Sequence, residues 1–259
     1  MNFLEQYHAL MTIIRKEITR CVRIKFQVFL PPVISMALFY CIFGSILGRH
    51  IPTSYTSGVA YIQYISPGLI MMSILMNSFI NTSSSFFGSK FSRSIEEMIV
   101  SPMPNYIILL GYICGGVFRG IVVGILVVLM SLFFTHLQVQ HWVVLLAVAF
   151  LTSIFFSQIG LLNGIFAKNF DDISWIPSFV IQPLTYLAGV FYSIQQLPPF
   201  WKSLSLLDPI HYIINNFRYA MLGVEGQTLT VSLLVLVGLN IVFFMFNLYL
   251  MKYSKGMRQ

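Results

Sequence analysis

The chain has 259 residues, of which 57% are hydrophobic and only 9% are charged. Its mean hydropathy of +0.82 does not fit a water-soluble domain, so the composition predicts a membrane protein. The formal net charge of +7 is better explained by membrane topology and anionic lipid headgroups than by nucleic acid, because no basic run with interleaved aromatic residues occurs in a polar segment.

Residues 1–25 predict an amphipathic helix that lies in the membrane interface. Asn2 followed by Glu5 is typical of a helix start. Apolar residues recur on one face, namely Phe3, Leu4, Tyr7, Leu10, Met11, Ile14 and Ile18. The other face carries Glu5, Thr12, Arg15, Lys16 and Thr19. Such a helix either only anchors the first span or also forms part of a lateral entrance for substrate.

Six apolar stretches are long enough to cross a bilayer, which takes about 20 helical residues. They are residues 26–47, 61–79, 106–134, 142–166, 173–192 and 230–251. Lysines and arginines gather before the first span, in the loops after the second and fourth spans, and in the C-terminal tail. The positive-inside rule then places both termini in the cytoplasm. We therefore expect an all-α membrane protein with a single transmembrane domain over residues 1–259.

A short cytoplasmic helix is predicted between the second and third spans. Ser94 and Glu97 fit an S-x-x-E capping box, and Pro102 and Pro104 end the helix after scarcely two turns. The apolar edge of this helix consists of Ile95, Met98 and Ile99. This edge needs a burial site, which is either a partner protein or the underside of its own membrane domain.

Arg119 lies inside the third apolar stretch, where a charge is costly enough to suggest a function. Because this stretch is longer than one crossing needs, the guanidinium group could reach lipid headgroups at the inner interface. Alternatively, it contacts an acidic part of a substrate. Glycines at four-residue spacing predict close helix packing around it, and they are Gly111, Gly115, Gly116, Gly120 and Gly124.

Residues 193–229 precede the last span and are expected on the external side. Asp208 suits a helix N-cap, Pro209 suits the first helical position, and Gly223 suits the end of the helix. The apolar stripe of this helix is Ile210, Ile213, Ile214, Phe217 and Met221, and its polar side is Asn215, Asn216 and Arg218. We expect re-entrant helices that dip into the outer leaflet or lie over the bundle and cap the outer end of any pathway.

The sequence lacks the Walker A, G-x-S-x-G and H-E-x-x-H motifs, so we expect neither an enzyme nor a bound cofactor or metal. His136 and His141 have a spacing that suits neither metal ligation nor a catalytic dyad. Buried acidic residues for ion coupling are also missing from the spans. This weakens the alternative of an ion-coupled secondary transporter or channel.

The C-terminal third resembles the permease subunits of type 2 ABC exporters. The similarity lies in residues 187–192 (LAGVFY), 197–198 (LP), 208–212 (DPIHY) and 218 (R). Ala188 departs mildly from the pattern, which more often has Gly, Ser, Thr or Cys there. Residues 86–102 also resemble the intracellular coupling segment of this family. The resemblance covers essentially the whole chain.

The resemblance implies partners and site residues. Relatives lie in the bacterial inner membrane, pair with a second permease copy, here expected as a homodimer, and dock two ATPase subunits that bind ATP and Mg. Their cargo is a drug, lipid or lipid-linked glycan, so an amphipathic or hydrophobic substrate is expected. The ATPase contacts would be Ser94, Ile95, Glu96, Glu97, Met98, Ile99, Asp171 and Asp172. The external gate would be Pro198, Pro199, Trp201, Pro209, His211 and Phe217.

Overall fold

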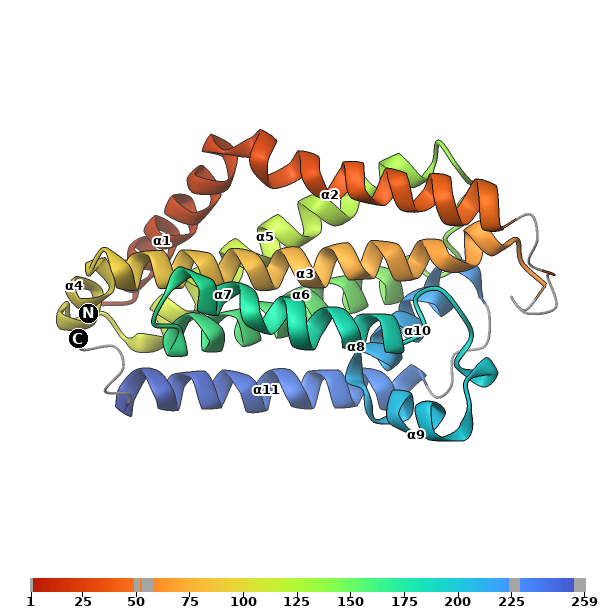
Figure 1. Ribbon diagram of the computed structural model, residues 1–259. Helices are drawn as coiled ribbons and strands as arrows, with labels where there is room; N and C mark the ends of the chain where they lie inside the picture. The colour runs from red at the N-terminus through yellow and green to blue at the C-terminus, as the bar shows by residue number, and fades with distance from the viewer. Residues whose placement is uncertain (1, 49–51, 53–57, 224–228, 254–259) are drawn as a thin grey trace.

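A computed structural model of the chain describes residues 2–48, 52, 58–223 and 229–253. Every regular element within these residues is a helix, which confirms the all-α fold. The helices form an elongated bundle with α4 (Ser94–Val100) at one end and α9 (Pro199–Leu207) and α10 (Pro209–Leu222) at the other (Figure 1). Parts of the predicted external segment and of the basic tail, residues 224–228 and 254–259, lie outside the described residues.

Five helices among the described residues are long and apolar enough to cross a membrane. They are α2 (Lys25–Phe39) with its π-helical continuation Tyr40–Leu47, α3 (Tyr61–Phe91), α5 (Asn105–Ser131), α6 (Trp142–Phe166) and α11 (Leu229–Tyr253). These five elements correspond to the first, second, third, fourth and sixth stretches predicted from the sequence.

The fifth predicted stretch, residues 173–192, is not one of these five helices. Here α7 (Phe170–Ile176), a π-helical segment (Pro177–Ile181) and α8 (Gln182–Leu187) follow one another without a gap. Two prolines, Pro177 and Pro183, remove backbone donors from this run and favour its irregular geometry. The helix ends at Leu187, before the predicted boundary, because Gly189 takes a positive φ of 84°.

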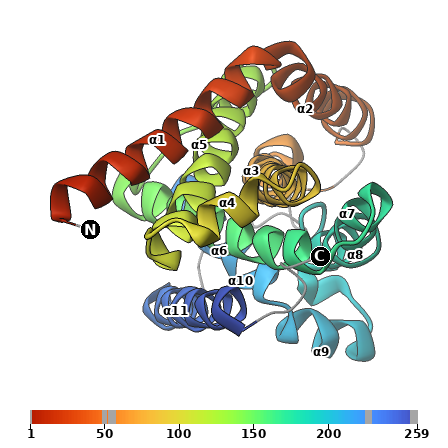
Figure 2. The same cartoon turned by 90° about the vertical axis from the view of Figure 1, so that its left-hand side faces the viewer.

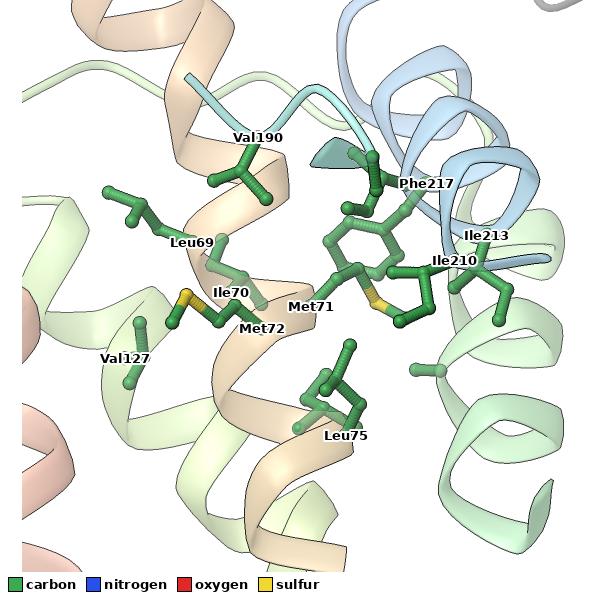
Figure 3. Packing of buried hydrophobic residues seen from close by; sticks show 14 of the residues in the cluster. Leu69, Ile70, Met71, Met72, Leu75, Val127, Val190, Ile210, Ile213 and Phe217 are labelled. Carbon is green, nitrogen blue, oxygen red and sulfur yellow. The ribbon is translucent and has the colours of Figure 1, made fainter. Parts of the chain in front are cut away.

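Helix α3 lies in the middle of the bundle, with α2 and α11 on the outside (Figure 2). Of its apolar window, 89% is buried, compared with 17% for α2 and for α11. Figure 3 shows how Leu69, Met71 and Leu75 of α3 fill the space between α5, α6 and α10. The interior of the single chain is therefore packed with side chains around α3.

The glycines of α5 allow it to approach its neighbours closely, as the sequence predicts. A Cβ atom at Gly120 would overlap Ser78 Oγ of α3, and one at Gly124 would lie 2.6 Å from Ile74 Cγ1. On another side of α5, a Cβ atom at Gly115 would lie 2.7 Å from Glu17 Cβ. Small residues thus bring α5 against two helices at once.

Helix α1 (Phe3–Arg23) begins as predicted, with the Asn2 backbone N–H donating to Glu5 Oε2 at 3.0 Å. It packs along the first half of α5 through its buried residues Ile13, Glu17 and Cys21. Of the predicted apolar face, Phe3, Leu4, Tyr7 and Met11 are exposed, whereas Leu10, Ile14 and Ile18 are partly buried. Helix α1 therefore has one face on the bundle and a separate apolar face that is available to lipid.

Candidate functional site

Polar side chains follow one face of α3 at four-residue spacing. They are Asn77, Asn81, Ser85 and Ser89. Ser85 Oγ donates to Glu17 Oε1 of α1 at 2.6 Å, and Asn81 Oδ1 accepts from Arg20 Nη2 at 2.8 Å. Glu17 and Arg20 also form an ion pair at 3.2 Å. Because Glu17 is fully buried, these contacts compensate its lost hydration and hold α1 in one register on α3.

Arg119 joins the same row from α5. Its Nε donates to Asn77 Oδ1 at 3.2 Å, and its side chain is only partly exposed. A contact between two helices of the same chain favours a structural role over direct binding of an acidic substrate. The part that Arg119 takes in transport stays a prediction.

The apolar edge of α4 is covered largely by its own membrane domain. Ile95 has no exposed surface, and Met98 and Ile99 are partly buried in the same hydrophobic cluster. The predicted capping box is wrong, because α4 begins at Ser94 itself, after Arg93 in the left-handed conformation with φ 59°. Ser94 Oγ instead donates to Ser89 O at 3.2 Å. Ile95 therefore cannot contact a partner in this conformation.

The loop between α6 and α7 uses Asp172, one of its two predicted ATPase-contact residues, to start α7. Asp172 Oδ2 accepts from the backbone N–H groups of Lys168 at 2.8 Å and Asn169 at 3.1 Å. These hydrogen bonds hold the pKa of Asp172 below its ordinary value. Asp171 is exposed and lies next to Phe170, whose ring is 5.2 Å from that of Phe91.

Parts of α3, α4 and α7 lie at this end of the bundle (Figure 2), and each of these helices carries exposed residues. We call them the inner-end surface, which comprises Phe91, Glu97, Val100, Phe170 and Asp171. Val100 has 87% of its surface exposed and Phe91 has 71%. Exposed large apolar side chains and carboxylates at the same end of a bundle are features that a protein partner can cover.

At the opposite end, α10 is built as the sequence predicts. Asp208 Oδ1 accepts from the Ile210 backbone N–H at 2.9 Å, and Gly223 ends the helix with φ 67°. The whole apolar stripe of α10 is buried against α3, α6 and α11, and Phe217 and Ile213 point toward Met71 (Figure 3). Helix α10 therefore fills this end of the bundle with its apolar side chains.

Two residues of the polar side of α10, Asn216 and Arg218, are buried. Arg218 Nη2 donates to Gly189 O at 2.9 Å, and its Nε donates to Tyr64 O at 3.3 Å. Its guanidinium carbon lies 4.0 Å from the centroid of the Tyr64 ring. Burial lowers the pKa of Arg218, and the backbone carbonyl groups serve as its partners. The family resemblance singled out Arg218 by its position after DPIHY but indicated none of these partners.

His211 ties α10 to the same turn after α8. Its Nδ1 lies 3.2 Å from Ala188 O, and its Nε2 lies 3.0 Å from Asn215 Nδ2. This pattern fits a neutral ring that donates from Nδ1 and accepts at Nε2, and burial lowers the pKa of His211. Burial also raises the pKa of Asp208 to about 6.

The predicted gate residues do not form one cluster. His211 and Phe217 are buried under α10, whereas the other four are exposed. These exposed residues are Pro198, Pro199, Trp201 and Pro209. In the described part of the chain, which includes His136 and His141, no group of three His, Cys, Asp or Glu side chains comes together that could hold a metal ion.

A second polar row follows the outside of the α7–α8 run. Its members are Ser174, Ser178, Gln182 and Tyr186, again four residues apart and exposed or partly exposed. Gln182 Nε2 donates to Tyr186 Oη at 2.8 Å. Hydrocarbon offers no partners for polar side chains, so this face favours contact with another chain, with water or with a polar part of cargo.

Comparison with known proteins identifies the family to which this chain is similar. The family described as ABC-2 type transporter matches residues 8–222. The chain is 50% identical over 250 residues to the inner membrane transport permease YadH of Escherichia coli K12, covering 96% of this chain and 97% of that protein. It is also 24% identical over 186 residues to nodulation protein J of Rhizobium leguminosarum bv. viciae, covering 70% of this chain and 71% of that protein.

Proposed function

This chain belongs to the ABC-2 type transporter family as a multi-pass permease of the inner membrane, and we propose that it forms the translocation path of an ATP-driven exporter. The family implies an ATPase partner. We assign ATP and Mg to two copies of that separate subunit and no cofactor to this chain. We further propose that the α7–α8 run completes six crossings and that both termini face the cytoplasm.

The packed interior is the observation that carries the rest of the proposal. Because side chains fill the space around α3, the described part of one chain has no room for a cargo-sized path there. We propose that the path forms between two copies, with the polar row of α7–α8 facing it. An amphipathic or hydrophobic cargo suits such a path, since polar groups alternate there with Trp175 and Phe179.

Cross-linking tests the arrangement of the two copies. In a variant without the native cysteines, a single cysteine at Ser178 is expected to cross-link two copies in membranes. A cysteine at Val242, which is exposed on α11, serves as the matched control and should stay monomeric. Cross-linking at Val242 but not at Ser178 would place the interface elsewhere.

Co-purification tests the docking of the ATPase on the inner-end surface. Glu97→Lys combined with Val100→Asp reverses one charge and buries another in the proposed contact, so less ATPase should remain bound. Leu207→Asp is the control, because Leu207 is 80% exposed on α9 at the other end. An unchanged ATPase-to-permease ratio in the double variant would refute docking at this surface.

Thiol labelling tests the orientation. An impermeant reagent applied to intact cells should label a single cysteine at Gln195, before α9, and not one at Lys252, near the end of α11. Both positions are exposed, so accessibility depends on the side of the membrane. The reverse pattern would overturn the proposed topology.

A further inference from the structure

A groove of about 480 Å³ follows one side of α1. Its lining residues are Thr12, Arg15, Lys16, Thr19, Arg20, Arg23 and Ile24. Four of these seven residues are cationic and none is acidic. The groove is therefore a concentrated positive site, and its volume suits a small polar group.

The acidic residue in the middle of α1 does not neutralise this groove. Glu17 points to the bundle, where it accepts from Ser85 Oγ and packs on Gly115. Its ion pair with Arg20 engages only one of the four cations. The positive charge of the groove thus remains available to a ligand.

Two of the cations are held in place by the bundle. Lys16 Nζ donates to Ser89 Oγ at 3.3 Å and lies 5.8 Å from the centroid of the Tyr112 ring. Arg20 Nη2 donates to Asn81 Oδ1 at 2.8 Å. These contacts fix the wall of the groove that faces α3, which lowers the entropy lost when a ligand binds.

The other two cations are directed to solvent. Arg15 and Arg23 are exposed and form no hydrogen bond or ion pair with the part of the chain that the structure describes. A guanidinium group offers paired donors that match phosphate oxygens. Arg15 and Arg23 therefore supply the free donors of the site.

The neighbouring face of α1 selects a ligand that also has an apolar part. Phe3, Leu4, Tyr7, Met11 and Val22 are all exposed. Acyl chains would cover this face while a phosphate group reaches the groove beside it. We propose that the groove binds the phosphodiester headgroup of an anionic phospholipid from the leaflet at the α4 end.

Lipid binding to the purified permease tests this site. Short-chain phosphatidylglycerol is titrated against phosphatidylcholine with the same acyl chains and against inorganic phosphate. Wild type should bind phosphatidylglycerol more tightly than either. Arg15→Gln with Arg23→Gln removes two charges near the headgroup and should weaken binding about 30-fold, and each single substitution about fivefold.

The matched control removes two charges from the same end of the bundle but outside the groove. It combines Lys168→Gln with Lys252→Gln, both exposed, and should keep affinity within about twofold of wild type. A melting temperature is recorded for every variant, and the single substitutions decide the result if the double variant does not fold.

Four results would overturn the proposal. Unchanged affinity in the Arg15 and Arg23 variants would remove the site, and an equal loss in the control would mean diffuse attraction. Binding of inorganic phosphate as tight as that of phosphatidylglycerol would indicate a site for free phosphate. If the Arg15 and Arg23 variants lose co-purified ATPase but keep lipid binding, the groove binds an acidic protein surface. That outcome also rejects the proposed lipid site.

Discussion

Replacement of Arg218 by methionine should destabilise the end of the bundle that contains α9 and α10. Methionine roughly keeps the apolar length of the side chain but leaves Gly189 O and Tyr64 O without their donors. Hydrogen bonds from a charged donor are worth about 1.5–3 kcal/mol each. Part of this loss is offset because the variant no longer buries a guanidinium group. We expect a net loss of about 2–4 kcal/mol in the free energy of unfolding.

Arg218→Lys should fall between wild type and the methionine variant. An ammonium group is too compact to reach Gly189 O and Tyr64 O together, so one carbonyl group loses its donor. The control is Lys202→Met, an exposed position at the same end of the molecule, which should change stability by less than about 0.5 kcal/mol.

Thermal unfolding in detergent measures these losses in a background in which Cys41 and Cys114 are replaced by serine. A thiol-reactive dye then reports exposure of the buried Cys21. For a chain of this size, about 2–4 kcal/mol corresponds to a fall in melting temperature of about 5–15 °C. A methionine variant that melts with wild type would refute the idea that Arg218 anchors α10. The same result for methionine and lysine would show that the number of donors does not matter.

Three further predictions concern other positions. Arg119→Lys should keep most transport activity. Arg119→Leu leaves the Asn77 side-chain oxygen without its donor and should lower the yield of folded protein. A lysine variant that assembles and hydrolyses ATP but transports nothing would make Arg119 part of the substrate path. Burial raises the pKa of Asp208 from 3.8 to about 6, so folding takes up a proton and wild type should gain stability as the pH falls through 6 toward 4. Asp208→Asn keeps the cap but cannot titrate, so its melting temperature should lack this gain between pH 7 and about 4.5, and parallel profiles would contradict the assignment. Gly120→Val should cost about 1–3 kcal/mol because its side chain overlaps Ser78 Oγ, while Gly238→Ala, with nothing within 4 Å, should not destabilise the chain in this way.

The sequence alone determined the fold class and several helix ends, although α3 runs to Phe91 and not to the predicted residue 79. Long apolar stretches define spanning helices because the length of a helix and the thickness of a bilayer are fixed by simple geometry. The caps at Asp208 and Gly223 were predictable because they depend on neighbouring backbone groups only. The glycine spacing of α5 likewise identified a face for close packing before its partners were known.

Only the tertiary structure decided what covers each face. Ile95 is covered by other side chains of the same chain, and Arg218 is buried. The sequence predicted the helices that carry these two residues, but not what packs against them. The partners of Arg218 lie far away in the chain, since Tyr64 is 154 residues distant and Gly189 is 29. Periodicity shows which side chains share a face, but the cost of burying them depends on which groups the fold places opposite, and local sequence does not contain that information.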